Sequence, residues 1–342
     1  MAVTLRDISK KVGKSVTTVS RALHGYNDVS PETKAMVRRL ADELGYTPNI
    51  LAQRLQKQRT DTIGFVLPTF GPRFSDPYFS EILAGIGNQA AEMGYDLLVS
   101  TQPPGEQELD AYKKLVEGRR VDGFIIVRTR CKDARIEYLC KAEFPFVAFG
   151  RTQSPCNFPY VDEDSEIGMR LMVDHLAERG FERFSYLAAP ENLMFAEFRL
   201  KGFLDGLSAN NLPQDDHLIV IGDLTQNGGY AQANILLDLP EPPDAIVASN
   251  DLMAIGAISA AQEKGLRVGQ DIAITGFDDT PMAEHSHPPL TTVHQPVYKI
   301  GRMVCEMLIK RIQGEFLEEE QIILMPSLVI RQSCGGQLVE TP

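Results

Sequence analysis

The apolar positions of the first 46 residues recur with the period of short helices. Leu5, Ile8 and Val12 fall on one helical face, and the three-residue spacing of Thr4 and Asp7 before them is that of a capping box. We therefore expect a first helix that begins after Thr4 and ends at the glycine that follows Val12.

Two further helices are predicted behind it. Ser15 can cap a short helix over residues 16–23, and Ser30 with Pro31 opens a third that continues towards Gly45. A turn of about three residues that contains glycine separates the first two helices, which is helix-turn-helix spacing. The sequence thus predicts a small three-helix head.

From residue 62 the pattern changes to short apolar strands that alternate with helical stretches. Such alternation predicts an α/β fold with a parallel sheet covered on both faces, and the series restarts after about residue 162. We expect two similar lobes around a cleft, because ligands of open α/β sheets bind beyond the carboxyl ends of the strands. The expected divisions are a head over 1–46, a hinge helix and linker over 47–60, and a sensor over 61–342, with lobe 1 about 61–161 and 293–324 and lobe 2 about 162–292 and 325–342.

The segment Pro48 to Leu55 is a candidate hinge. Eight residues make a helix that is marginal in water alone, so this one would need DNA or a partner to form. Paired hinge helices can wedge a leucine into a minor-groove step. An ordinary linker is the alternative reading.

Charge is distributed unevenly along the chain. The total is −12, which argues against a protein that coats nucleic acid, but residues 1–60 carry +6 and the remainder −18. Only the head is attracted to polyphosphate, although a solvated basic face would look the same. No apolar run approaches a membrane span or a signal core, so we expect a cytoplasmic protein without membrane partners.

The second helix of a helix-turn-helix presents its N-terminal residues to base edges. Val16 and Thr17 would therefore meet bases, and the small hydroxyl residues Ser15, Thr18 and Ser20 suit phosphates. A three-helix protein-binding module is the alternative for this unit.

The stretches TLRDISKKVGKSVTTVSRALHG, VSPETKAMVRRLADELGY and PNILAQRL resemble the head and hinge of the lactose-repressor (LacI/GalR) family. The rest of the chain resembles that family's sensor, which is like a periplasmic binding protein. The resemblance implies a homodimer that reads a near-palindromic operator, with Val16 and Thr17 as the variable specificity pair and His24 where asparagine is usual. The candidate DNA-binding residues are Thr4, Ser15, Val16, Thr17, Thr18, Ser20, Arg21, His24, Asn49, Ala52 and Leu55.

Three strand ends of the second lobe finish in polar side chains, at Asn250, Asp278 and Gln295. Taken alone, each could be a helix cap. The resemblance places these three and Arg199 at cleft positions that hydrogen-bond the effector. An arginine and an acid that can pair with vicinal hydroxyls favour a polyol-like ligand.

The first lobe adds Asp76, Tyr78 and Phe79, which resemble the segment with which sugar-binding relatives stack rings on a pyranose; aromatic core packing is the alternative. Gly150 and Arg151 occupy positions where Asp-Arg is common in the family. Leu224 occupies a position where many relatives have an aromatic residue that covers the ligand. That loss of bulk would suit a disaccharide. The candidate effector residues are Asp76, Tyr78, Phe79, Arg151, Arg199, Asn250, Asp278 and Gln295.

Enzyme signatures are weak. Gly85 to Ala90 matches a loose dinucleotide fingerprint, but it falls inside a predicted helix rather than at a strand end. Neither the histidines nor the five cysteines have metal-ligand spacing, and we read all five cysteines as reduced thiols. We expect no enzyme, no cofactor and no metal site.

The predicted function is repression of carbohydrate genes that a sugar relieves. Corepression by a purine or sugar phosphate, and a sugar-binding protein without DNA function, are the alternatives. The C-terminal QSCGGQLVETP lacks leucine heptads, which favours a dimer over a tetramer.

Overall fold

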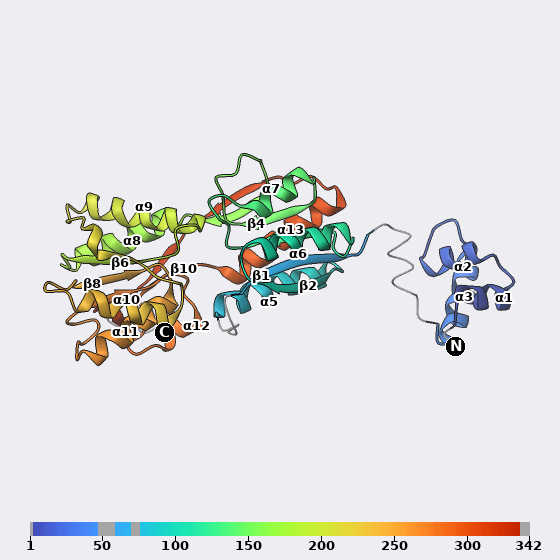
Figure 1. Cartoon of the computed structure of the whole chain (residues 1–342). Coiled ribbons are helices and arrows are strands. Elements are labelled where there is room, and N and C mark those ends of the chain that lie inside the picture. The colour runs from blue at the N-terminus through green and yellow to red at the C-terminus, as the bar shows by residue number, and fades with distance from the viewer. Residues whose placement is uncertain (1–2, 47–58, 70–75, 336–342) are drawn as a thin grey trace. The chain divides into compact units, whose positions relative to one another are not determined.

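The computed structural model describes residues 3–46, 59–69 and 76–335. Contacts divide the chain into two compact units, 1–60 and 61–342 (Figure 1). The predicted fold class is confirmed: helices form the first unit, and parallel sheets flanked by helices form the second.

The head consists of α1 (Leu5–Val12), α2 (Val16–Leu23) and α3 (Pro31–Glu43). Ser15 and Ser30 cap α2 and α3 by accepting the backbone N–H groups of Thr18 and Thr33. The side chains that face inward form one small core, of which Ile8, Val19, Ala22, Val29, Val37 and Ala41 are buried. Local capping signals therefore suffice to define these helices.

Lobe 1 of the second unit is a six-stranded sheet in the order β11-β5-β4-β3-β1-β2, and every neighbouring pair is parallel. Its elements are β1 (Thr62–Pro68), α5 (Pro77–Glu92), β2 (Asp96–Gln102), α6 (Glu106–Glu117), β3 (Gly123–Ile126), α7 (Ala134–Lys141), β4 (Phe146–Phe149), β5 (Tyr160–Glu163), α13 (Val297–Gln313) and β11 (Gln321–Leu324). Helices α5 and α13 share one apolar core with the sheet, and α6 and α7 share the other.

Lobe 2 has a four-stranded parallel sheet in the order β7-β6-β8-β9. Its elements are α8 (Ser165–Glu178), β6 (Phe184–Ala188), α9 (Met194–Ala209), η1 (Asp216–Leu218), β7 (Ile219–Ile221), α10 (Gln226–Leu237), β8 (Ala245–Ala248), α11 (Asp251–Glu263), β9 (Ala273–Thr275), α12 (Pro281–His285) and η2 (Gln332–Cys334). Helices α8 and α9 pack on one face of the sheet and α10 and α11 on the other (Figure 1).

The chain passes between the lobes three times: after β5, near β10 (Thr292–His294), and between β11 and β12 (Ser327–Val329). β10 and β12 pair antiparallel, so two of the three crossings are hydrogen-bonded to each other.

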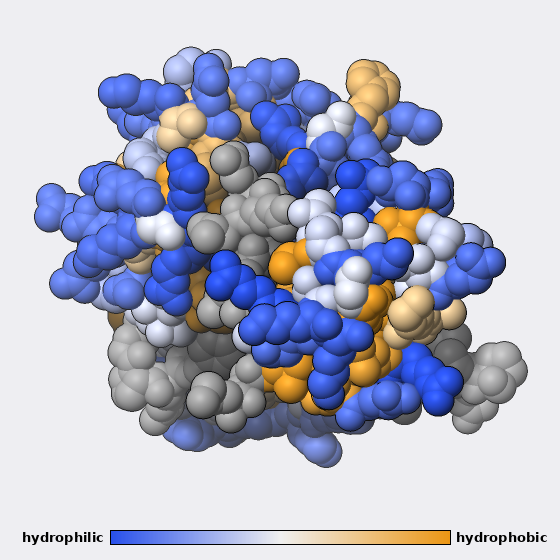
Figure 2. Space-filling view, turned by 90° about the vertical axis from the view of Figure 1, so that its right-hand side faces the viewer, coloured by the Kyte–Doolittle hydropathy of each residue, from blue (hydrophilic) through white to orange (hydrophobic). Residues whose placement is uncertain are grey.

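Polar residues cover most of the face seen in Figure 2. No helix within the described ranges is long and apolar enough to cross a membrane.

The glycines of the loose dinucleotide fingerprint lie inside α5, as their pattern indicated. A Cβ on Gly85 would lie 2.2 Å from the backbone oxygen of Tyr298, and one on Gly301 would lie 2.6 Å from the oxygen of Ile82. Both glycines therefore allow α5 and α13 to pack closely, and the fingerprint has a structural explanation.

The expectation that all five cysteines are reduced is wrong for one pair. Cys140, at the end of α7, and Cys156, in the segment between β4 and β5, form a disulfide with a Cα–Cα distance of 6.6 Å. Their separation of 16 residues matches no motif, because the pair meets only when α7 packs beside that segment. Cys131, Cys305 and Cys334 are free thiols.

Candidate functional site

The first candidate surface is the exposed side of α2. Val16 is 38% exposed and Thr17 is also exposed, as contact with bases requires. Ser15 and Thr18 hydrogen-bond each other at 2.8 Å, and Ser20 is half-buried. The hydroxyls thus stabilise the start of α2, while Val16 and Thr17 face outward.

Arg21 and His24 lie at the other end of α2. The Arg21 guanidinium pairs with Asp28 at 2.7 Å and lies 5.1 Å from the centroid of the Tyr26 ring. His24 Nδ1 lies 2.6 Å from the Ser20 carbonyl oxygen. Both side chains are exposed, and their local contacts fix where they point.

Thr4 is the N-cap of α1. Its backbone N–H and its hydroxyl both donate to Asp7 Oδ2, at 2.9 and 2.7 Å, and these bonds lower the pKa of Asp7. The hinge candidates Asn49, Ala52 and Leu55 lie outside the described residues.

The second candidate site is a small pocket between the lobes, which we call the inner pocket. Six of the eight predicted effector residues line it: Tyr78, Arg151, Arg199, Asn250, Asp278 and Gln295. The remaining lining residues are Arg128, Thr129, Phe149, Gly150, Asp162, Ser165, Phe195 and Leu224. Asp76 and Phe79 instead line an adjoining space.

Arg199, on α9, is the central cation of the inner pocket. Its guanidinium lies 3.6 Å from the Phe277 ring centroid, donates to the Ser249 carbonyl oxygen, and pairs with Asp278 Oδ1 at 3.3 Å. The residue is 4% exposed, and its Nε has no hydrogen-bond partner among the described residues. The described residues therefore do not use the full hydrogen-bonding capacity of this buried cation.

Asp278 has a strained backbone and a buried carboxyl. Its φ is +113° and that of Asp279 is +56°, both in the region that disfavours side chains. Burial raises the pKa of Asp278, an effect that the charge of Arg199 partly opposes. Thr280, which follows Asp279, donates from its backbone N–H to Asp251 Oδ2 at 2.7 Å. The turn is thus fixed to the start of α11.

Asn250 is both a helix cap and a pocket residue. Its Oδ1 accepts the Met253 backbone N–H at 3.0 Å, and its Nδ2 donates to the Leu224 carbonyl at 3.2 Å. The cap reading and the pocket reading therefore both describe this side chain. Gln295 is 6% exposed, and its Oε1 lacks a partner within the part of the chain that the structure describes.

Arg151 reaches across the cleft from the end of β4. It donates to Asp162 at 2.6 Å and lies 3.9 Å from the ring centroid of Phe198 on α9. Gly150, beside it, has a φ of +111°, and a Cβ there would lie 2.5 Å from Thr129 Oγ1. The expectation that glycine at position 150 leaves extra space for a ligand is therefore wrong, because Thr129 occupies the place of a side chain there and the backbone makes a tight turn.

Glu163 was not among the predicted site residues. It ends β5, is fully buried, and neither carboxylate oxygen has a partner among the described residues. Burial raises its pKa to about 8, and the charge of Arg199 and the nearby Gln295 amide partly oppose that increase. The amide is not within hydrogen-bond geometry of the carboxyl. The run YVDED, where acids follow an apolar strand, was the available signal.

The larger space beside the inner pocket, which we call the outer groove, measures about 830 Å³. It shares Arg128 and Leu224 with the inner pocket. Arg128 pairs with Asp76 at 2.7 Å, and its guanidinium lies 4.5 Å from the Phe79 ring centroid. Contacts with Arg128 therefore hold Asp76 and Phe79 at the outer groove. Arg128 was not among the predicted site residues.

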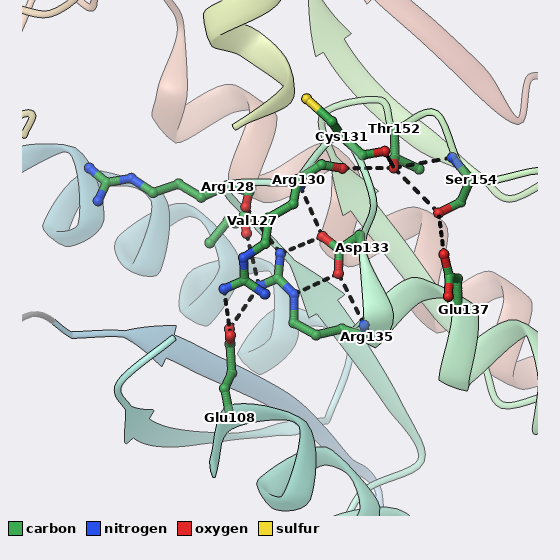
Figure 3. A network of polar contacts seen from close by, with 10 residues as sticks. All are labelled: Glu108, Val127, Arg128, Arg130, Cys131, Asp133, Arg135, Glu137, Thr152 and Ser154. Carbon is green, nitrogen blue, oxygen red and sulfur yellow. Dashed lines mark hydrogen bonds and ion pairs between the residues drawn. The ribbon is translucent and has the colours of Figure 1, made fainter. Parts of the chain in front are cut away.

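A buried ion network holds the segment that carries Arg128 (Figure 3). Arg135 is 1% exposed and pairs with Asp133 at 2.7 Å and with Glu108 at 2.9 Å. Arg130 pairs with Glu108 at 2.5 Å, and Arg135 also donates to the Arg128 carbonyl at 3.0 Å. The Arg128 side chain extends away from this cluster (Figure 3), so the network orients it towards the cleft.

Taken together, a helix-turn-helix head and a two-lobed domain with a polar cleft define the class of ligand-responsive DNA-binding regulators. Residues 4–49 match the family model described as bacterial regulatory proteins, lacI family, and residues 173–334 match a periplasmic binding protein-like domain. The chain belongs to the lacI family and is a DNA-binding transcriptional regulator.

Curated relatives match over nearly the whole chain. The HTH-type transcriptional regulator CelR of Thermobifida fusca is 34% identical over 96% of this chain and 98% of its own. The HTH-type transcriptional repressor CytR of Escherichia coli (strain K12) is 33% identical over 97% of this chain and 96% of its own.

Solved structures agree with this assignment. A CelR–cellobiose complex is 32% identical with a TM-score of 0.75, covering 97% of this chain and 99% of its own. The lac repressor dimer bound to operator and the anti-inducer ONPF is 30% identical with a TM-score of 0.86, covering 98% and 99%.

Proposed function

We propose that this regulator represses carbohydrate uptake or catabolism genes and leaves its operator when a neutral sugar binds in the inner pocket. The observation that carries the proposal is the pairing of Arg199 with Asp278, beside polar atoms of Arg199 and Gln295 that have no hydrogen-bond partner among the described residues. Such a set offers both donors and acceptors to vicinal hydroxyls without a net charge to neutralise.

The size of the inner pocket supports a ligand-driven change. Its volume is about 50 Å³, which holds a few waters at about 10–15 Å³ each, whereas small-molecule sites span about 300–1,000 Å³. A sugar fits only after side chains or lobes move. Binding then favours one lobe arrangement over the other, which is the requirement for coupling to DNA.

The lobes are joined beside the pocket by contacts that such a movement would alter. Backbone N–H groups of Met194 and Cys131 donate to the carbonyls of Thr129 and Asn192 at 2.9 and 3.0 Å. Gln153 Nε2 also donates to Glu197 Oε2 at 2.8 Å. We infer that these cross-lobe bonds distinguish the two states.

We further propose that the protein is a cytoplasmic homodimer without catalytic activity. The relatives are regulators, and the acids that line the inner pocket are paired with arginines, Asp162 with Arg151 and Asp278 with Arg199. In the described ranges no group of three or more His, Cys, Asp or Glu side chains could hold a metal ion.

A thermal-shift screen of the full chain against monosaccharides, disaccharides, nucleobases and sugar phosphates tests the ligand class. A ligand at 100 times its Kd adds about 2.7 kcal/mol of stability. We expect a sugar hit that disappears in Asp278→Asn and persists in Asp271→Asn, a surface acid-to-amide control. A hit only from a purine or a phosphate ester would contradict the carbohydrate assignment.

A further inference from the structure

Cys140 and Cys156 form a disulfide in a protein that binds DNA. Proteins that work beside DNA lie where small thiols keep most cysteines reduced, and disulfides found there are usually transient and catalytic or redox-sensing. We propose that this pair, which we call the redox pair, is a reversible oxidation site through which the thiol–disulfide balance of the cell changes operator binding. The inference goes beyond the proposed function, on which only the direction of the effect rests.

Both sulfurs of the redox pair belong to half-buried residues, which small oxidants can reach. The other three cysteines are poorer reaction sites. Burial raises the pKa of Cys131, an effect to which Glu197 adds, and burial raises that of Cys305 to about 12. Cys334 is fully buried. Because the thiolate is the reactive form and must also be accessible, oxidation is directed to the redox pair.

The oxidant is a low-molecular-weight disulfide such as oxidised glutathione. One cysteine thiolate attacks a sulfur of the oxidant, whose S–S bond breaks and releases one glutathione thiolate. The second cysteine thiolate attacks the mixed disulfide, closes the Cys140–Cys156 bond and releases the second glutathione thiolate. Two electrons pass from the protein to the oxidant, and the two protons that the cysteines lose are taken up by the two released thiolates. Excess reduced glutathione reverses the exchange.

The disulfide fastens a segment that reaches the second lobe. Residues 150–156 include Arg151, which lines the inner pocket, and Gln153, whose side-chain amide donates to Glu197 on α9 at 2.8 Å. Cys156 ends this segment, and its partner lies in the last turn of α7. The covalent bond therefore limits how far the segment can move with the second lobe.

The hydrogen bond between α7 and this segment is weak by comparison. Figure 3 shows Ser154 beside Glu137 of α7, and the hydroxyl donates to that carboxylate at 3.5 Å, which is long for a hydrogen bond. Helix α7 itself is held, because its Arg135 is buried in the ion pairs with Asp133 and Glu108. Helix α7 is thus an anchor, and the state of the redox pair decides whether the segment is fastened to it.

Oxidation therefore favours the lobe arrangement of this structure. In it the redox pair is closed, the bond from Gln153 to Glu197 is made, and the inner pocket measures about 50 Å³. Small-molecule sites span about 300–1,000 Å³, so this is the arrangement without ligand. Under the proposed function that arrangement holds the operator. We therefore expect the oxidised protein to bind operator more tightly than the reduced protein when no sugar is present.

The full chain, equilibrated either in oxidised glutathione or in excess reduced glutathione, tests the site. Maleimide trapping with peptide mass spectrometry should find the redox pair linked in the first buffer and free in the second. Hydrogen exchange over residues 150–156 should become about tenfold faster on reduction, because the segment opens more easily. Operator selected from a random pool should bind the oxidised form at least about fivefold more tightly.

Two variants locate the effect. Cys156→Ser should exchange and bind operator like the reduced parent in both buffers. Cys131→Ser, which removes a free thiol of the same lobe, is the matched control and should respond to oxidation as the parent does. The comparison of the two parent forms needs no variant, so it decides the matter even if Cys156→Ser folds poorly.

A redox pair that stays linked in excess reduced glutathione is a structural disulfide, and a pair that stays free in oxidised glutathione forms none; either result would overturn the inference. Equal operator affinity of the two forms would overturn it as well. If trapping and exchange change as expected but the oxidised form binds operator more weakly, the oxidation site stands. The proposed release by a sugar then fails, because the ligand-free arrangement is not the one that holds the operator.

Discussion

Glu163 is a fully buried carboxyl without a hydrogen-bond partner in the described part of the chain, and its surroundings decide its charge. Removing a carboxylate from water is costly, so the group keeps its proton up to a pKa of about 8. Gln295 and Arg199, which line the inner pocket, are close to Glu163, so its protonation alters the electrostatic field in that pocket.

The raised pKa of Glu163 makes the free energy of unfolding depend on pH. Between its ordinary pKa of 4.5 and about 8, the folded state holds a proton that the unfolded state has lost, so stability falls as pH rises through this window. Glu163→Gln removes that loss. We expect its Tm to exceed that of the parent by about 2 °C or more at pH 8.5 and to approach the parent value near pH 5.

Differential scanning calorimetry across pH 5 to 9 checks this, with Glu263→Gln on the exposed surface as a control that should follow the parent at every pH. A Tm difference between Glu163→Gln and the parent that does not change with pH would show that Glu163 is ionised throughout.

At the scale of elements, variants of the two serine caps of the head can distinguish an effect on stability from an effect on DNA binding. Ser15 caps α2, whose exposed Val16 and Thr17 face outward, and Ser30 caps α3 in the same way. Loss of such a cap costs about 1 kcal/mol.

We expect Ser15→Ala and Ser30→Ala to destabilise the head by similar amounts, measured by thermal unfolding of the full chain. Ser15→Ala should weaken operator binding more, because it frays the helix that presents Val16 and Thr17. Equal losses of operator affinity in the two variants would mean that α2 is not the reading helix.

Sequence reasoning succeeded where the signals are local. The helices of the head begin where Thr4, Ser15 and Ser30 predicted, because an N-cap acts within its own turn. The sequence did not indicate Arg128, which pairs with Asp76, or Glu163, whose pKa the charge of Arg199 influences, because both partners lie far away in the sequence. Residue type alone does not reveal such partners.

The inner pocket shows the same division. The family resemblance predicts Arg199, Asn250, Asp278 and Gln295 as effector residues, and all four line the inner pocket. Asn250 and Asp278 follow β8 and β9 of one parallel sheet, whose strand ends meet at one edge, whereas no strand pattern indicates Arg199 on α9. Asp76 belongs to the groove instead, because it pairs with Arg128. The Cys140–Cys156 pair had no spacing signal either.

At the scale of the whole molecule, a basic head and an acidic sensor are joined in one chain. Release by a sugar requires that lobe movement in the sensor changes how two heads hold a near-palindromic operator. Only a ligand that binds the two states with different affinity can do this, and a coupling of about 1–3 kcal/mol is usual.

The most direct test is fluorescence anisotropy of operator DNA, selected from a random pool with the full chain, titrated with and without the sugar found by thermal shift. We expect the sugar to lower operator affinity by about 5- to 150-fold in the parent, and Asp278→Asn to stay bound at the same sugar concentration. An operator affinity that is unchanged or increased by every sugar that binds would contradict release by a sugar.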